Sequence, residues 1–127
     1  MPTYNFQQQF VVPILNKTKP HTIRMPRKRP TKAGDLIYMY TGLRTKKAKK
    51  FAESICVDVS PITIYPYIGH IRWGDGNLFE EIEIEVLFNK DGFTNGRDFF
   101  DFFIRKYKSS ALHLEIIEWD IDRLVRC

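Results

Sequence analysis

The six residues Lys-Pro-His-Thr-Ile-Arg at positions 19–24 bring together side chains that can move protons and bind anions. If residues 22–24 are extended, Thr22 and Arg24 point to one face, and Lys19 arrives from the preceding turn. A lysine near a buried threonine hydroxyl and a carboxylate can act as a base, because loss of water lowers its pKa toward about 7–8. The alternative is structural: Thr22 bonds to backbone, Lys19 is solvated and Arg24 braces a loop. The spacing alone leaves both interpretations open.

Other signatures of chemistry are absent from the sequence. It contains no Gly-rich phosphate loop, no CxxC or HExxH motif, and no serine in a nucleophile elbow. His21, His70 and His113 are scattered singly, and a lone histidine beside strands is typical of a packing residue with its hydrogen bonds satisfied. The two cysteines are too few for a disulfide scaffold. We therefore expect no metal and no cofactor.

The charge of the chain is unevenly distributed. Residues 1–60 contain 12 Lys and Arg against 3 Asp and Glu, whereas residues 61–127 contain 8 against 12. Basic blocks attract phosphates by releasing condensed counterions, so a polyanionic partner is one interpretation, and a solvated face or mobile loop is the other. The predicted nucleic-acid contacts are Arg24, Arg27, Lys28, Arg29, Arg44, Lys46 and Lys47.

Length and composition indicate one globular domain over 1–127. The hydrophobic fraction of 43% is sufficient for a single core, and no apolar run approaches the ~20 residues of a membrane helix. The N-terminal residues show no targeting pattern, so we expect a cytoplasmic protein with no membrane partner.

The elements that must position these residues follow from periodicity and turn signals. We expect a short helix with Pro13 in its first turn, a loop over 26–30, and a helix over 95–108 capped by Asn95. A turn is expected at 73–77. Strands are expected at 36–41, 53–60, 62–68, 80–86 and 112–119, with Pro61 ending the second of them. Five or six short strands without a βαβ rhythm predict an α+β domain built on a small antiparallel or mixed barrel.

Three segments carry a resemblance to a known family. They are the Ile-Leu…Lys-x-x-Thr-Ile-Arg signature at 14–24, the Gly-Asp at 34–35 that opens a strand, and the Asp-Gly-Phe with a Phe-rich helix at 91–103. The chain resembles the ASCH superfamily over nearly its whole length, in particular the small bacteriophage and prophage-type members.

This resemblance implies a PUA-like β-barrel of five to six short strands with two or three helices and a cleft between them. Proteins of this fold commonly bind RNA or modified nucleobases. A bacterial branch removes the acetyl group from N4-acetylcytidine with a lysine as proton acceptor, a threonine as nucleophile and an acidic residue as proton donor. By resemblance these roles fall on Lys19, Thr22 and Asp91, where aspartate stands in place of that branch's glutamate.

Three functional hypotheses follow. The first is a domain that binds RNA or a modified nucleobase or nucleoside through a basic rim and a small polar cleft. The second is an amidohydrolase acting on N4-acetylcytidine or a related amide. The third is a phage-encoded module that binds a host protein through the acidic second half of the chain.

Overall fold

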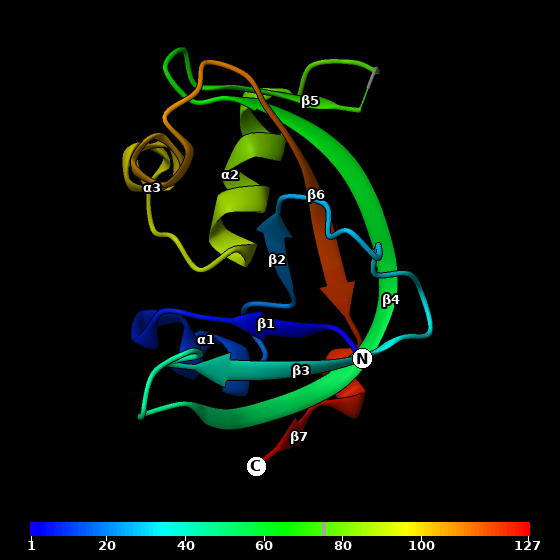
Figure 1. Ribbon diagram of the computed structural model, residues 1–127. Helices are drawn as coiled ribbons and strands as arrows, with labels where there is room; N and C mark the ends of the chain where they lie inside the picture. The colour runs from blue at the N-terminus through cyan, green and yellow to red at the C-terminus, as the bar shows by residue number, and fades with distance from the viewer. Residues whose placement is uncertain (75) are drawn as a thin grey trace.

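One long strand, β4 (Lys49–Tyr65), runs through both halves of the molecule and joins them. The computed structural model describes residues 1–74 and 76–127. In Figure 1, β4 is the curved green strand, with α2 and α3 beside its upper half and β1, β3 and α1 beside its lower half. The other strands are β1 (Thr3–Asn5), β2 (His21–Arg24), β3 (Leu36–Thr41), β5 (His70–Trp73), β6 (Leu112–Trp119) and β7 (Val125–Arg126).

The strands form one mixed sheet that confirms the α+β class. Its order is β1-β3-β4-β6-β2, with β5 and β7 also paired to β4. The pairing of β1 with β3 is parallel, and the other pairings are antiparallel. The expected closed barrel is not formed in the described chain, because the end strands β1 and β2 do not pair with each other. The Arg24 side chain instead reaches across to the Asn5 carbonyl.

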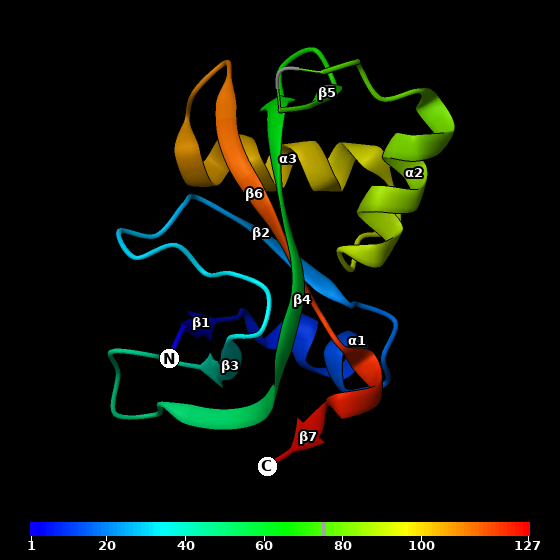
Figure 2. The ribbon, with the colours of Figure 1, turned by 90° about the vertical axis from the view of Figure 1, so that its right-hand side faces the viewer.

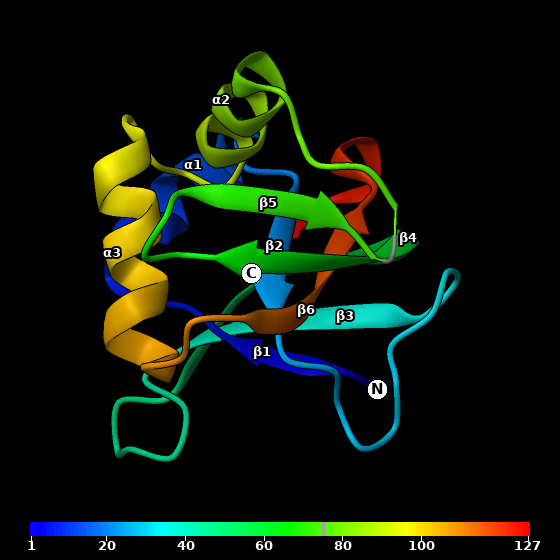
Figure 3. The same cartoon turned by 90° about the horizontal axis from the view of Figure 1, so that it is seen from above.

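The helices fill the spaces beside this sheet. In Figure 3, α3 runs across the direction of β4 and β5. None of the described helices combines the length and the apolar character that crossing a membrane requires. The helical segments are η1 (Gln8–Phe10), α1 (Val11–Leu15), α2 (Glu81–Lys90), α3 (Gly96–Tyr107) and η2 (Ile121–Arg123).

The expected helix over 95–108 is confirmed by α3, and the reason is local. Asn95 accepts a hydrogen bond from the Asp98 backbone N–H, as an N-cap residue should. Phe99 and Phe103 are buried, and both rings meet other phenylalanines edge to face. The strand expected at 112–119 is also confirmed, with the same bounds.

The strand expected at 80–86 is wrong, because this segment begins helix α2. Its alternating Glu and Ile residues fit a strand, but Glu80 and Glu83 form a capping box that starts a helix. Ile82 and Val86 then lie one helical turn apart and are largely exposed, while Leu87 is buried. The capping box and the burial of Leu87 therefore determine that this segment is helical, despite its period-two pattern.

The expectation that Pro61 ends a strand is also wrong, since β4 continues through it to Tyr65. The Pro61 carbonyl accepts a hydrogen bond from the Gly74 backbone N–H on the side where β5 has already ended. In the part of the chain that the structure describes, β5 has no strand residue opposite Pro61, so the N–H that proline lacks is not needed for a β4–β5 ladder bond. The turn expected at 73–77 includes residue 75, which lies outside the described residues.

Two hydrophobic cores lie at the two ends of the sheet. The lower core packs β1, η1 and α1 against β3 and the first half of β4, around Ile14, Met39 and Trp119. The upper core packs α2 and α3 against β5, β6 and the second half of β4, around Phe99 and Phe103. Phe93 and Phe102 contact both cores. The candidate site lies at this junction.

Candidate functional site at the junction of the two cores

Lys19 and Asp91, which are 72 positions apart, form a buried ion pair. The Lys19 Nζ lies 2.7 Å from Asp91 Oδ1 and 2.8 Å from the Asp91 backbone carbonyl oxygen. Both residues are at most 4% exposed. Nζ also lies 4.8 Å from the centre of the Phe10 ring, within reach of a cation–π interaction. The lysine is therefore not solvated, contrary to the structural alternative considered for it.

A tight reversal after α1 brings Lys19 to this position. Lys17 takes the left-handed backbone conformation, with φ of 69°. The backbone N–H groups of Thr18 and Lys19 both donate to the Pro13 carbonyl. The chain then enters β2, whose pairing with β6 holds His21 opposite Glu118. The lysine side chain is thus directed inward by a hydrogen-bonded turn.

Asp91 is placed by the end of α2. It is the C-cap residue, so its carbonyl has no partner within the helix and is available to the Lys19 ammonium. Gly92 follows with φ of 94°, and a Cβ there would lie 3.0 Å from a Phe10 ring carbon and 3.3 Å from Lys19 Cδ. Only glycine fits this turn without displacing the lysine.

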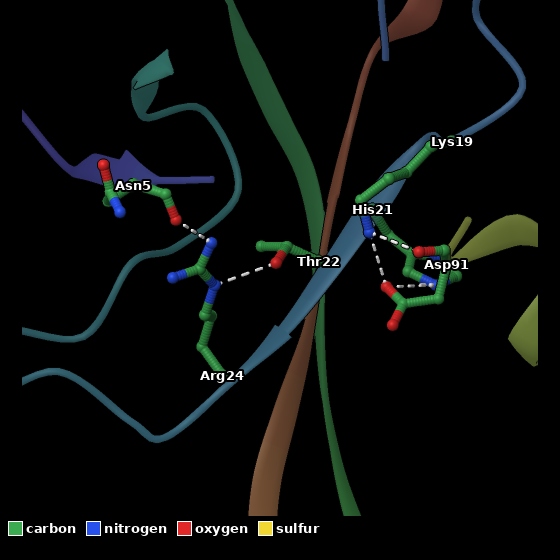
Figure 4. A network of polar contacts seen from close by, with 6 residues as sticks. All are labelled: Asn5, Lys19, His21, Thr22, Arg24 and Asp91. Carbon is green, nitrogen blue, oxygen red and sulfur yellow. Dashed lines mark hydrogen bonds and ion pairs between the residues drawn. The ribbon is translucent and has the colours of Figure 1, made fainter. Parts of the chain in front are cut away.

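Thr22 and Arg24 lie on the opposite side of β2 from Asp91 in the view of Figure 4. Arg24 Nε donates to Thr22 Oγ1 at 2.9 Å, and Arg24 Nη2 donates to the Asn5 carbonyl at 2.6 Å. The Arg24 guanidinium also lies over the Phe6 ring, 4.8 Å from its centre. Thr22 Oγ1 is the acceptor of the hydrogen bond from Arg24 Nε, so the Thr22 hydroxyl hydrogen is still available for donation to a ligand.

A cavity of about 250 Å³ separates these two groups and is lined by both. Lys19, Thr22, Arg24 and Asp91 all contribute to its wall, so the predicted residues of positions 19–24 meet Asp91 around one space. No hydrogen bond joins Thr22 to Lys19 or to Asp91 in the described structure. The other lining residues are Asn5, Phe6, Gln7, Phe10, Ile23, Phe102 and Lys106. We call this space the cleft.

The cleft adjoins a wider trough of about 640 Å³ along α3. Gln7, Phe10, Phe102 and Lys106 line both spaces. A ligand seated in the cleft therefore has room to extend along α3.

Burial lowers the pKa of Lys19, although the charge and hydrogen bond of Asp91 act in the opposite direction. The lowered pKa makes the neutral amine more accessible than in a solvated lysine. Moving one proton from Nζ to Asp91 Oδ1 over 2.7 Å would convert the ion pair into a neutral pair with the same total charge.

His21 is a buried neutral histidine beside this pair. Its Nε2 lies 3.5 Å from Asp91 Oδ1 and has no hydrogen-bond partner among the described residues. Burial lowers the pKa of His21 to about 4; the Asp91 charge opposes this shift and the charges of Lys19 and Lys90 add to it. The imidazole is therefore uncharged at neutral pH. His21 is buried, as expected of a packing histidine, but its Nε2 lacks the hydrogen-bond partner that was also expected.

We expect the buried His21 to lower the stability of the folded protein in mild acid. The unfolded chain takes up the His21 proton near pH 6.5 and the folded chain only near pH 4, so the free energy of unfolding falls by about 3 kcal/mol between these values. His21→Gln should lose this part of the pH dependence, measured by urea unfolding from pH 7 to pH 4. His70→Gln, at an exposed position of β5, is the control and should keep it. Equal slopes for wild type and His21→Gln would contradict the assignment.

Of the predicted nucleic-acid contacts, Arg24 lines the cleft, whereas the others lie in two basic loops, residues 25–32 and 42–48, that are not part of its wall. Residues 25–32 continue directly from Arg24 and are tied to β1 by a hydrogen bond between Thr31 and Tyr4. Residues 42–48 are tied to β1 by the Leu43 N–H, which donates to Asn5 Oδ1. Figure 2 shows both loops projecting from the same side of the molecule. The predicted contacts Arg27, Lys28, Arg29, Arg44, Lys46 and Lys47 are all exposed in these loops.

Sequence reasoning missed the contributions of the N-terminal segment and of α3. Asn5, Phe10, Phe102 and Lys106 line the cleft, and of these only Phe102 lies in a segment that carries the family resemblance. Asn5 is central because its carbonyl binds Arg24 and its side chain binds the second basic loop. No local pattern signals this role, since it depends on where β1 lies relative to β2.

The cleft offers nitrogen and oxygen donors and acceptors and no evident metal site. Within residues 1–74 and 76–127, no group of three or more His, Cys, Asp or Glu side chains is arranged to hold a metal ion. Among the described residues, Asp91 is the only carboxylate in the cleft wall, and Lys19 already occupies one of its oxygens.

These features define the class of protein: a small α+β domain with a buried lysine–aspartate pair at the wall of a polar cleft between two cores. The chain matches no protein-family model, and no curated protein or solved structure compared with it gives a significant match.

Proposed function

We propose that the chain binds single-stranded RNA or a nucleotide, with one nucleobase in the cleft and phosphates on the two basic loops. The observation that carries the proposal is the buried Lys19–Asp91 pair at the wall of a cavity that still has unused hydrogen-bonding groups. The ASCH resemblance of segments 14–24 and 91–103 supports the same function, and a relation to PUA-like barrels is part of the proposal.

The hydrogen-bonding groups of the cleft suit the edge of a nucleobase. Lys19 uses two of its three N–H donors within the described chain, and Thr22 keeps its hydroxyl hydrogen. Asp91 Oδ2 and these donors together match a ring that presents carbonyl, ring-nitrogen and amino groups side by side. Phe10 and Phe102 supply aromatic walls on which a base can pack.

The size of the cleft limits what it can hold. Its volume of about 250 Å³ lies just below the roughly 300–1,000 Å³ typical of pockets for drug-sized ligands. A single base fits this volume better than a whole nucleotide does. The sugar and phosphate would then lie outside, toward the loops or along α3.

The loops can supply the phosphate contacts. Residues 25–32 hold Arg27, Lys28 and Arg29, and residues 42–48 hold Arg44, Lys46 and Lys47. Both loops are anchored to β1, and β1 is linked to the cleft through the Arg24–Asn5 hydrogen bond. A base bound in the cleft is thereby close to a basic surface that attracts the phosphates of the same nucleic acid.

We expect binding of a short single-stranded RNA to weaken steeply with salt, by about 0.7 in log K per log unit of salt for each phosphate neutralised. Arg27→Glu/Arg29→Glu should reduce affinity at least tenfold at low salt and lower the slope by about 1.4. Fluorescence polarisation of a labelled decamer measures both quantities. Arg97→Glu/Arg126→Glu removes the same charge at exposed positions outside the loops and should leave the slope unchanged.

Two results would contradict this proposal. The first is an affinity that does not depend on salt. The second is an equal loss of affinity in the loop variant and in the control variant, because that would indicate a response to net charge alone.

A second candidate function is hydrolysis of an N-acylated nucleobase, and the pairing of Lys19 with Asp91 favours it. In the neutral form of the pair, Lys19 Nζ would accept the Thr22 hydroxyl proton while Thr22 Oγ1 bonds to the acyl carbon. Protonated Asp91 would then give its proton to the leaving amine as the C–N bond breaks. Water would hydrolyse the acyl-threonine, releasing the carboxylic acid and restoring the hydroxyl. The Arg24 Nε–H, which donates to Oγ1, would ease the loss of the hydroxyl proton from Thr22.

A further inference from the structure

A second cavity, of about 320 Å³, lies between α2 and the strands β4, β5 and β6. His21 lines it, whereas the next residue, Thr22, lines the cleft. In Figure 2, α2 lies on the opposite side of the molecule from the two basic loops. This cavity is therefore separate from the surface proposed to bind phosphates, and we call it the α2 cavity.

Apolar side chains form the walls of the α2 cavity and are left open to solvent. Trp73 is 42% exposed, Ile82 is 61% exposed and Val86 is 47% exposed. The Trp73 ring lies against the Phe79 ring at the edge of the upper core, with 4.5 Å between their centres. Large apolar groups gathered around a cavity in this way are typical of a binding site.

The polar groups of the α2 cavity are mostly acidic. Asp58, Glu83 and Glu118 line it, and Lys90 is the single cationic side chain among the described residues that line it. None of the three carboxylates forms an ion pair with a described residue. Asp58 accepts a hydrogen bond from the Ser60 hydroxyl, and Glu83 accepts one from the Glu80 backbone N–H. The cavity thus carries a net negative charge, which favours a cationic ligand.

One buried polar group also borders the α2 cavity without a complete set of partners. His21 is 3% exposed, and its Nε2 has no hydrogen-bond partner in the described chain. The walls therefore combine an aromatic surface, unpaired carboxylates and a neutral imidazole.

We propose that the α2 cavity binds a small organic cation with an aromatic or branched apolar body. The body packs on Trp73 between Ile82 and Val86, and the ammonium group faces Glu118 and Asp58. The indole adds a cation–π attraction when the charge lies over its face. The volume admits one such molecule, and the three carboxylates reject anions of the same shape.

Phenethylammonium is the probe for this site, with 2-phenylethanol as its uncharged counterpart and ethylammonium as the same charge without a ring. The chain has two tryptophans, and only Trp73 lines the α2 cavity, whereas Trp119 is 2% exposed. In ¹H–¹⁵N spectra, phenethylammonium should shift the Trp73 indole signal in a saturable manner and leave the Trp119 signal in place. The two counterparts should bind at least tenfold more weakly.

Glu118→Gln and Asp58→Asn remove one charge each without changing side-chain shape, and each should raise the Kd for phenethylammonium at least threefold. Glu81→Gln is the charge-matched control, because Glu81 is exposed on α2, the helix that borders the α2 cavity, and does not line the cavity itself. Equal binding of 2-phenylethanol, or no response of Trp73, would overturn the proposal. Sedimentation gives a further test. If the protein binds no probe but self-associates with increasing concentration, and Ile82→Lys abolishes this association, the cavity is an interface between copies and the proposal is overturned.

Discussion

Asp91→Asn is expected to lower the free energy of unfolding by about 3–5 kcal/mol, the usual result of leaving one member of a buried ion pair without its partner. The substitution keeps the shape of the side chain and removes its charge. Lys19 then keeps a carbonyl hydrogen bond but has no opposite charge within reach, at 2% exposure. Urea unfolding at pH 7 measures the loss.

The pH dependence of this variant tests the cause. Burial lowers the pKa of Lys19 in the folded state, so between that pKa and the unfolded value of 10.5 the unfolded chain binds more protons. The free energy of unfolding of Asp91→Asn should therefore rise as the pH increases from 7 toward 10. If Asp91→Asn lowers the free energy of unfolding equally at pH 7 and pH 10, the cause is a packing defect, and an unpaired buried Lys19 charge is excluded.

A double substitution separates the charge from the shape of the site. Lys19→Met alone leaves Asp91 unpaired and should be destabilising, whereas Lys19→Met/Asp91→Leu should recover most of the lost stability. The partly exposed pair Lys50–Glu53 has a similar separation of 2.8 Å, with side chains 29% and 27% exposed, and serves as the control. Glu53→Gln should have a much smaller effect, because water screens this pair. Additive losses at positions 19 and 91 would contradict the assignment.

Thr22→Val is expected to reduce the release of acetate from N4-acetylcytidine by a factor of at least about 100, if the cleft hydrolyses such amides as proposed. Valine keeps the branched shape and removes the hydroxyl that would attack the carbonyl. Thr22→Ser keeps the hydroxyl and should retain activity within about tenfold. Chromatography of the nucleoside product measures the rate, and circular dichroism checks that each variant is folded.

The outcome also separates the two proposed functions. Wild-type protein that binds N4-acetylcytidine in the cleft but releases no acetate would exclude hydrolysis and leave nucleobase binding standing. Equal rates for Thr22→Val and Thr22→Ser would show that the hydroxyl takes no part in the reaction.

Several elements could be predicted from the sequence because local forces decide them. The helix at 96–107 follows from the Asn95 cap and a phenylalanine stripe at helical spacing. The strand at 112–119 follows from the alternation of Leu112, Leu114 and Ile116 with polar residues. The segment at 80–86 shows the limit of this reasoning, since its alternation fits a strand while its capping box begins a helix. The closed barrel was predicted from the number and shortness of the strands. Whether the end strands pair depends on long-range packing, and here a side chain bridges them.

The sequence by itself determined which residues could carry chemistry and that Thr22 and Arg24 share a face of a strand, because neighbouring residues on an extended chain alternate in direction. Only the tertiary structure decided that Lys19 meets Asp91, that the Asn5 carbonyl binds Arg24, and that His21 stands between two cavities. The physical reason is that a charge interacts strongly only where burial removes water from around it. That burial is produced by the packing of α2, η1 and β2, which lie far apart in the chain.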